Sequence, residues 1–182
     1  MAKYKIVIDL LGSDKGPSAI LEGAKLILKE SPNVNLILVG PKEEVEKAGI
    51  DVSRIEVVDT AETVTNYDNP VEAFYKNPNV SVFKAVELAS HDDVSGIISA
   101  GNTGALFVAT LRYLLREDKT RPCMAAVLPT VNKGFTCLVD VGASIDVGPT
   151  QLLQFAHLGS EFMTNVYNIE NPKVGLLSNG VE

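Results

Sequence analysis

Short apolar runs alternate along most of the chain with longer segments in which hydrophobic residues recur at helical spacing. The runs are typical of buried strands and the longer segments of amphipathic helices. The pattern predicts strands at residues 4–9, 35–39, 55–58, 94–98, 124–128, 135–139 and 173–177. It predicts helices at 17–29, 42–47, 70–75, 80–90, 103–116 and 149–166, with a polar loop at 60–69.

Apolar strands separated by amphipathic helices indicate a mostly parallel sheet covered on both faces. We therefore expect an α/β fold, a three-layer α/β/α sandwich, with residues 1–182 forming a single domain. The short connection at 129–134 allows its two flanking strands to be antiparallel or laterally offset. A final parallel strand needs a helix to cover it, so we expect either further chain after the strand at 173–177 or a partner on that edge.

The segment 99–105 reads Ser-Ala-Gly-Asn-Thr-Gly-Ala and joins a predicted strand to a predicted helix. Gly101 and Gly104 allow positive φ and close approach to the backbone. Asn102 and Thr103 can donate from their side chains, and Thr103 is a suitable helix N-cap. The amide groups and partial positive charge of a helix N-terminus suit an anion such as phosphate. A tight strand-to-helix turn without a ligand explains the spacing equally well.

Three more glycine-bearing loops follow predicted strands, at residues 10–16, at 141–148 and from 178 onward. In parallel sheets, ligands bind outside the carboxyl ends of the strands. Several such loops at one edge favour a polar site of phosphate size or larger.

Composition narrows the classes of function. The 16 basic and 23 acidic residues give a formal net charge of −7, which argues against a nucleic-acid partner. The sequence contains no apolar run of bilayer length and no apolar signal-peptide core near residue 1. Cys123 and Cys137 lack metal-ligand spacing and lie in apolar stretches, as packed, reduced thiols do in a cytoplasmic protein. We therefore expect a cytoplasmic protein without a metal site.

Residues 8–17 (Ile-Asp-Leu-Leu-Gly-Ser-Asp-Lys-Gly-Pro) resemble the N-terminal signature of the bacterial phosphate acyltransferases of phospholipid synthesis, the PlsX family. The segment 99–105 matches the central motif of that family in full. Shorter motifs match in order at 121–122 (Arg-Pro), 128–130 (Leu-Pro-Thr), 140–143 (Asp-Val-Gly-Ala), 158–160 (Leu-Gly-Ser) and 174–180 (Val-Gly-Leu-Leu-Ser-Asn-Gly). The resemblance covers this whole chain and about the N-terminal half of a family member.

The resemblance implies a transferase that moves a long-chain acyl group from acyl carrier protein to inorganic phosphate, with acyl phosphate as product. It implies a fold similar to those of the phosphotransacetylases and of the isocitrate and isopropylmalate dehydrogenases. It further implies a homodimer without a cofactor, and peripheral contact with the inner membrane face through parts outside these residues.

Such a reaction requires phosphate to be held against a thioester carbonyl, and amide donors can stabilise both phosphate and the oxyanion. We predict that the catalytic residues are Asn102, Asp14 and Asp140. We predict that phosphate or substrate is bound by Gly12, Lys15, Ser99, Gly101, Thr103, Gly104, Gly142, Ser144 and Asn179. Asp140 is expected to orient the donors of the turn at 142–144. Each charged residue has a structural alternative: a helix cap for Asp14, a turn former for Asp140 and a solvated side chain for Lys15.

A cationic cluster, Arg112, Arg116 and Lys119, is predicted to dock the acidic carrier protein. A solvated helix end that complements the helix dipole explains the same cluster.

The chain departs from the family pattern at several positions. Ser13 replaces the second glycine of the first motif, and Leu10 and Leu11 replace Ala and Met. Ser144 and Ser178 stand where the family usually has Asn, and Lys76 is what remains of a basic cluster. Three alternatives therefore stay open: an acyl coenzyme A donor, a reductase subunit that holds the acyl group on cysteine, and a scaffold that binds the carrier protein without turnover.

Overall fold

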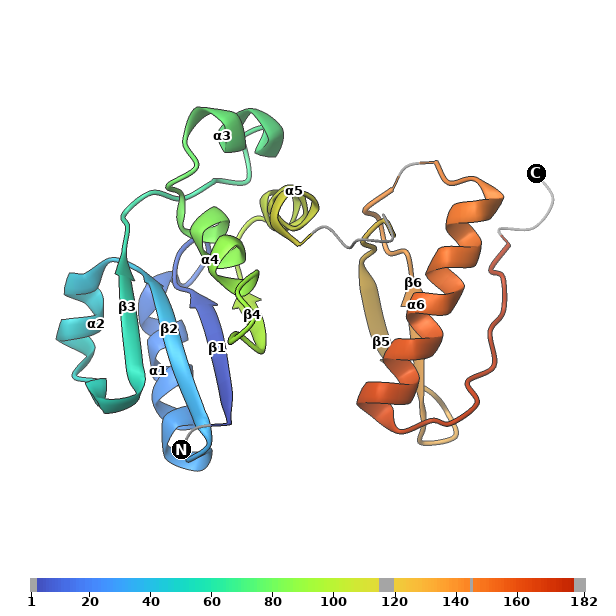
Figure 1. Ribbon diagram of the computed structural model, residues 1–182, viewed down its shortest axis with the longest axis horizontal. Helices are drawn as coiled ribbons and strands as arrows, with labels where there is room; N and C mark the ends of the chain where they lie inside the picture. The colour runs from blue at the N-terminus through green and yellow to red at the C-terminus, as the bar shows by residue number, and fades with distance from the viewer. Residues whose placement is uncertain (1–2, 115–119, 145, 179–182) are drawn as a thin grey trace. The chain divides into compact units, whose positions relative to one another are not determined.

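The computed structural model describes residues 3–114, 120–144 and 146–178. The chain forms two compact units, Met1–Arg116 (unit 1) and Glu117–Glu182 (unit 2), shown in Figure 1. The interpretation of the whole chain as one domain stays a prediction. Among the described residues, no helix has the length and apolar character needed to cross a membrane.

Unit 1 is built on a four-stranded sheet. Its strands are β1 (Tyr4–Asp9), β2 (Val34–Gly40), β3 (Ile55–Asp59) and β4 (Gly96–Ser99), in the order β3-β2-β1-β4. All neighbouring pairs are parallel, as predicted. Strands β2 and β3 are added in turn on one side of β1, and β4 is then added on the other side of β1. The point of reversal, where such folds bind ligands, therefore lies between β1 and β4.

Helices cover both faces of this sheet. Unit 1 contains α1 (Gly16–Glu30), α2 (Lys42–Ala48), the 3₁₀ helix η1 (Val52–Arg54), α3 (Pro70–Lys76), α4 (Ser81–Ala89) and α5 (Thr103–Tyr113). Helices α1 and α2 pack against one face, where their buried residues meet Ile8, Leu36 and Leu38. Helix α4 covers the opposite face, where Ala85 packs with Val7 and other strand residues. The predicted α/β/α layering is thus confirmed in unit 1.

The alternation of strand side chains explains which residues of β1 face each layer. Val7 packs on the α4 side, whereas Ile8 joins the α1 and α2 side. Successive strand residues point to opposite faces, so Asp9 lies on the same face as Val7. A carboxylate therefore lies at the buried end of β1, where the pattern would place an apolar side chain.

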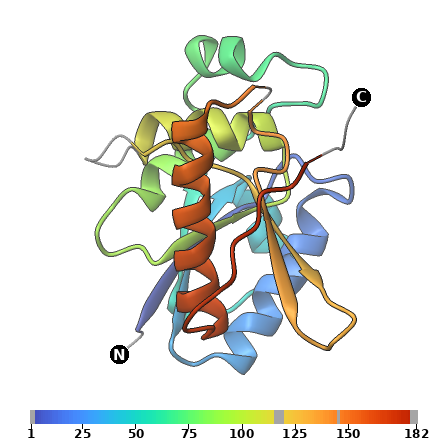
Figure 2. The same ribbon diagram turned by 90° about the vertical axis from the view of Figure 1, so that its right-hand side faces the viewer.

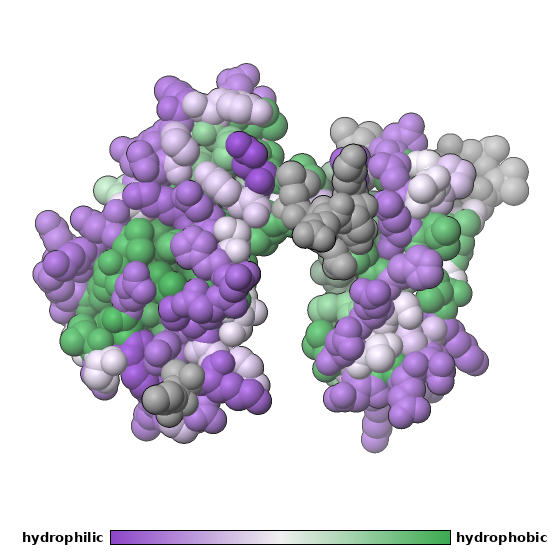
Figure 3. Space-filling model, in the orientation of Figure 1, coloured by the Kyte–Doolittle hydropathy of each residue, from purple (hydrophilic) through white to green (hydrophobic). Residues whose placement is uncertain are grey.

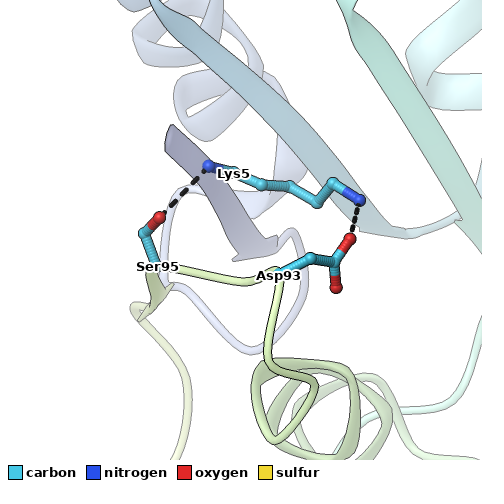
Figure 4. Close-up of polar contacts among 3 residues, drawn as sticks. All are labelled: Lys5, Asp93 and Ser95. Atoms are coloured by element: carbon cyan, nitrogen blue, oxygen red, sulfur yellow. Dashed lines mark hydrogen bonds and ion pairs between the residues drawn. The ribbon is translucent and has the colours of Figure 1, made fainter. Parts of the chain in front are cut away.

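Polar contacts fix the start of β4 beside β1 (Figure 4). The ammonium group of Lys5 forms an ion pair with Asp93, and the backbone amide of Lys5 donates to Ser95 Oγ at 3.4 Å. The amide of Ser95 in turn donates to the Lys5 carbonyl at 2.8 Å. These contacts join residues 88 and 90 positions apart and set the register that continues to the carboxyl ends of the two strands.

The guanidinium of Arg54 fixes the end of α1. It donates to the carbonyl oxygens of Ser31 at 2.9 Å and Val34 at 3.2 Å, and also to that of Leu28. The last carbonyls of a helix have no partner inside the helix, so the Arg54 guanidinium, at the end of η1, supplies a hydrogen-bond donor to them. Nearby, Figure 3 shows hydrophobic surface over β2 and β3 between hydrophilic areas of unit 1.

Unit 2 contains β5 (Ala125–Pro129), β6 (Phe135–Val139) and α6 (Pro149–Tyr167). The two strands form an antiparallel pair, which decides between the two arrangements that the short connection allowed. Helix α6 lies along this hairpin, as Figure 2 shows, and a Cβ added to Gly159 would lie 3.3 Å from Val139. The predicted strand at 173–177 is wrong, because these residues are not part of any strand that the structure describes.

Candidate functional site

Two glycine-bearing turns meet at the carboxyl ends of β1 and β4. Asp9 and Ser99 are register partners at the last position of these parallel strands, so the segments 10–16 and 99–104 leave the sheet side by side. A Cβ added to Gly12 would lie 2.8 Å from the Gly101 Cα, closer than a real Cβ comes to a non-bonded atom, so only glycine fits at this contact without a shift of the backbone. The predicted shared edge is therefore confirmed for these two turns, which lie at the point where the strand order reverses. The loop at 141–148 follows β6, a strand of the separate two-stranded sheet, so the expectation that it ends a strand of the same sheet is wrong.

Asn102 caps helix α5. Its Oδ1 accepts the Ala105 amide at 2.9 Å, and its Nδ2 donates to the Thr65 carbonyl at 3.1 Å. The expected cap, Thr103, is instead the first residue of the helix, so that prediction is wrong. Both polar atoms of the Asn102 side chain are used in shaping the turn. Its catalytic role stays a prediction.

The start of α5 presents unpaired backbone donors. The amides of Thr103 and Gly104 have no hydrogen-bond partner among the residues that the structure describes, and both residues are exposed. The Gly101 amide is used inside the turn, where it donates to Ser99 Oγ at 3.2 Å. Of the turn residues predicted to bind phosphate, Thr103 and Gly104 thus offer the free amides, at the positive end of a helix.

A third segment, residues 60–70, lies against the same turn. Besides the Thr65 carbonyl that accepts from Asn102, a Cβ on Gly104 would lie 3.1 Å from the Pro70 ring. The side chain of Thr63 lies 3.4 Å from the Cβ position of Gly12. Because this segment touches both glycine turns, it forms a further wall of the candidate site, which sequence pattern alone described only as a polar loop.

Asp14 and Lys15 lie on the first turn and are exposed. Lys15 occupies the N-cap position of α1 without a side-chain cap hydrogen bond. The alternative that Asp14 caps this helix is therefore wrong. Both side chains reach solvent beside Gly12, and their predicted roles stay predictions.

Asp9 is the residue that the sequence reasoning missed. It is 1% exposed; its Oδ2 accepts the Ser99 hydroxyl at 2.7 Å and its Oδ1 accepts the Leu11 amide at 3.2 Å. Burial raises the pKa of this carboxyl, while the hydroxyls of Ser99 and Ser81 and the amide of Leu11 oppose the rise. The signal that could have found it is an acidic residue that ends an otherwise apolar strand directly before a glycine turn.

In unit 2, Asp140 organises the turn that follows β6. Its Oδ1 accepts the amides of Met124 at 3.0 Å and Ala143 at 3.2 Å, and its Oδ2 accepts the Ser144 amide at 2.8 Å. Burial raises the pKa of Asp140, but the amide donors outweigh burial and hold that pKa below its ordinary value. Asp140 thus orients this turn, as expected, and Gly142 adopts a φ of +117° within it. Whether these residues bind substrate stays a prediction.

The family model described as "Fatty acid synthesis protein" matches residues 4–182. This chain belongs to that family. The resemblance drawn from the motifs is confirmed, and members of the family include proteins named phosphate acyltransferase.

One such relative, from a Nitratiruptor species, is 40% identical over 181 residues, which are 98% of this chain and 54% of the relative. Another, from Enterococcus faecalis, is 37% identical over 182 residues with the same two shares. The chain thus spans about half the length of the curated relatives that it matches.

A solved structure, a branched-chain phosphotransacylase from Enterococcus faecalis V583, has a TM-score of 0.52 to this chain at 14% sequence identity. The match covers 88% of this chain and 51% of that one. At this identity the likeness shows a shared fold, and it agrees with the fold class predicted from the strand and helix pattern.

The fold accommodates Ser13, which the motif resemblance marked as a departure from the expected glycine. The φ of Ser13 is outside the left-handed region, whereas Gly12 and Gly16 have φ values of +81° and +67°. The Ser13 hydroxyl donates to the Gly16 carbonyl at 3.1 Å, and the Gly16 amide donates back to the Ser13 carbonyl at 3.0 Å. The serine therefore closes the turn without backbone strain.

Of the three residues predicted to dock the carrier protein, the structure describes Arg112. Arg112 is exposed in the last turn of α5, where a cation complements the helix dipole. Arg116, Lys119 and the predicted substrate residue Asn179 lie outside the described residues. Their roles stay predictions.

The cysteines differ from the expectation of packed thiols, because Cys123 and Cys137 are each half-buried. Burial raises the pKa of both thiols, and the nearby Asp140 carboxylate raises that of Cys123 further. The thiolate is the nucleophilic form, so these environments disfavour a thioester on either cysteine.

Proposed function

We propose that this chain carries the phosphate-binding part of an acyltransferase that transfers a fatty acyl group from acyl carrier protein to inorganic phosphate. The observation that supports the proposal is the pair of backbone amides of the exposed residues Thr103 and Gly104, which have no hydrogen-bond partner in the described part of the chain and lie at the positive end of α5, beside the Gly12 turn. Family membership and the names of the relatives supply the class of reaction.

In the proposed reaction, a phosphate oxygen attacks the thioester carbonyl carbon. The new C–O bond forms as the C–S bond breaks, and the thiolate of the carrier leaves and takes up the proton that phosphate loses. The products are acyl phosphate and the free thiol of the carrier. Amides at a helix start would hold the phosphate without a reorganisation cost during the reaction, and would raise its effective concentration beside the thioester.

One substitution tests the amide of Thr103 directly. Thr103 is the first residue of α5, where proline fits because its missing N–H has no partner inside the helix. Asn102 before it has an extended backbone (ψ 116°), which a following proline requires. We expect Thr103→Pro to retain α5 and to weaken phosphate binding about tenfold or more, because a hydrogen bond to a charged group is lost. Thr103→Ala keeps the amide and is the matched control for the lost hydroxyl.

The activity is tested with the protein at its natural length, palmitoyl carrier protein and labelled phosphate, with acyl phosphate trapped by hydroxylamine. We expect hydroxamate that depends on both substrates and falls in Thr103→Pro. Acyl phosphate from palmitoyl coenzyme A alone would replace the proposal with a phosphotransacetylase-like reaction. Carrier binding without product from either donor would replace it with a scaffold.

The partners and location follow from the same proposal. The carrier protein is acidic, so we propose that Arg112 and the cations after α5 receive it, and that the protein works in the cytoplasm as a homodimer with peripheral membrane contact. Reversing the charge of Arg112 and Arg116 together should weaken carrier binding while phosphate affinity stays constant. Unchanged carrier binding in that variant would assign these residues to the solvated end of the helix.

A further inference from the structure

The buried carboxylate of Asp9 contacts both glycine turns of the candidate site. Its two oxygens accept different donors: Oδ1 the amide of Leu11, in the turn after β1, and Oδ2 the hydroxyl of Ser99, at the start of the turn after β4. Ser99 Oγ then accepts the amide of Gly101. One side chain thus connects two turns whose residues are about 90 positions apart in sequence.

The chemistry of this connection requires an acceptor at both oxygens of residue 9. The Ser99 hydroxyl has one proton, which it donates to Asp9, and its lone pair is then free to accept from Gly101. An asparagine at position 9 has one acceptor oxygen and one NH₂ group, which only donates. If the NH₂ group faced Leu11, it would meet the Leu11 amide, which is itself a donor. If it faced Ser99, the hydroxyl proton of Ser99 would lose its acceptor. Either orientation breaks one link of the chain of hydrogen bonds.

Close approach of the two turns makes this connection tight. A Cβ on Gly101 would lie 3.2 Å from the Leu11 carbonyl oxygen and 3.4 Å from both Asp9 Oδ2 and Ser99 Oγ. The backbone at Gly101 therefore rests directly on the Asp9–Ser99 pair. Just beyond it, α5 begins at Thr103 and presents the free amides.

We propose that Asp9 is a positioning residue that locks the turn after β1 to the turn after β4 and so fixes the amides at the start of α5 for the anion. The inference rests on the proposed function for the identity of the anion. Asp9 acts through Ser99 and Gly101, and its carboxylate is buried beneath the turns rather than exposed to the ligand.

The test is a double-substitution cycle on Asp9→Asn and Ser99→Ala, with inorganic phosphate as the probe. We expect each variant to weaken phosphate affinity about tenfold, and the double variant to be no weaker than Asp9→Asn, because both changes interrupt the same chain of hydrogen bonds between the two turns. Affinity for the acyl donor should stay within about twofold of wild type in all three, which general unfolding would not allow. Ser99→Thr, which keeps the hydroxyl, should restore phosphate affinity. The control is Ser90→Ala, which removes a hydroxyl bonded to the Glu87 carbonyl at the end of α4.

A measurement without ligand separates this inference from the proposed function. Amide hydrogen exchange, resolved by residue, should quicken in both turns in Asp9→Asn and only in residues 101–104 in Ser99→Ala. If wild-type protein binds no phosphate, the proposed function fails, and exchange still decides the inference. Unchanged exchange at Leu11 and Gly101 in Asp9→Asn, or phosphate effects of the two substitutions that add independently, would overturn it.

Discussion

The contact between the two glycine turns predicts a large stability effect from one methyl group. Gly12 has a φ of +81°, and an alanine Cβ there would lie 2.8 Å from the Gly101 Cα. The left-handed backbone costs an alanine about 1–2 kcal/mol. The added Cβ would also overlap the backbone of Gly101, which cannot rotate away as a side chain can, and overpacking of this kind costs a further ~1–3 kcal/mol. We therefore expect Gly12→Ala to lower the unfolding free energy of unit 1 by about 2–5 kcal/mol.

Two other glycines of unit 1 serve as controls. Gly16 also has a positive φ, +67°, but a Cβ there meets nothing within 4 Å, so Gly16→Ala isolates the backbone cost of about 1–2 kcal/mol. Gly23 lies within α1 in open space, so Gly23→Ala should raise stability by about 0.5–1 kcal/mol.

Hydrogen exchange of the β1 and β2 amides, which reports unfolding of unit 1 by itself, measures all three variants. The reasoning predicts the order Gly23→Ala, wild type, Gly16→Ala and Gly12→Ala, from most to least stable. Equal losses in Gly12→Ala and Gly16→Ala would refute the close approach of the turns, and with it the geometry of the candidate site.

Two further predictions concern charged groups that bind backbone. Arg54→Met should lower the stability of unit 1 by about 2 kcal/mol, because the carbonyls of Leu28 in α1, Ser31 at its C-cap and Val34 at the start of β2 lose a charged donor; urea unfolding checks this. Lys25→Met, which removes only an exposed ion pair, should change stability by less than about 0.5 kcal/mol, and an equal loss would contradict the role of Arg54. Asp140→Asn should destabilise unit 2 by about 2 kcal/mol at neutral pH, because the carboxylate accepts three amides. The folded-state pKa of Asp140 lies below 3.8, so its stabilisation is complete above 3.8 and is lost as the pH falls through the folded pKa. The stability difference between wild type and Asp140→Asn should therefore shrink below pH 3.8, and a constant difference would refute the role of the ionised form.

Local pattern predicted most elements of the chain because their causes are local. The apolar run 4–9 became β1 and the periodic segment 17–29 became most of α1, since side-chain periodicity and backbone hydrogen bonding act over a few residues. The segment 173–177 has the same apolar character but is not a strand. Whether an extended segment joins a sheet depends on a partner strand, which residues within the segment cannot supply.

The candidate site shows the same division. The sequence indicated the glycine turns and the anion-binding start of α5, because Gly101, Asn102 and Gly104 lie within a few positions of one another. It misassigned the cap to Thr103, since serine, threonine and asparagine are all good caps and tertiary contact decides among them. Asn102 takes the position here, and its amide also reaches Thr65.

By itself, the sequence determined the family, the alternation of strands and helices, the parallel character of the main sheet and the turns that end its strands. Only the tertiary structure decided that β4 lies beside β1, that Gly12 touches Gly101 and that Asp9 accepts from Ser99. The reason is physical: hydrogen bonding and periodicity within an element depend on neighbours in sequence. The order of strands depends instead on which distant faces bury each other, and a carboxylate at a strand end acquires its role only from the strand that pairs with it.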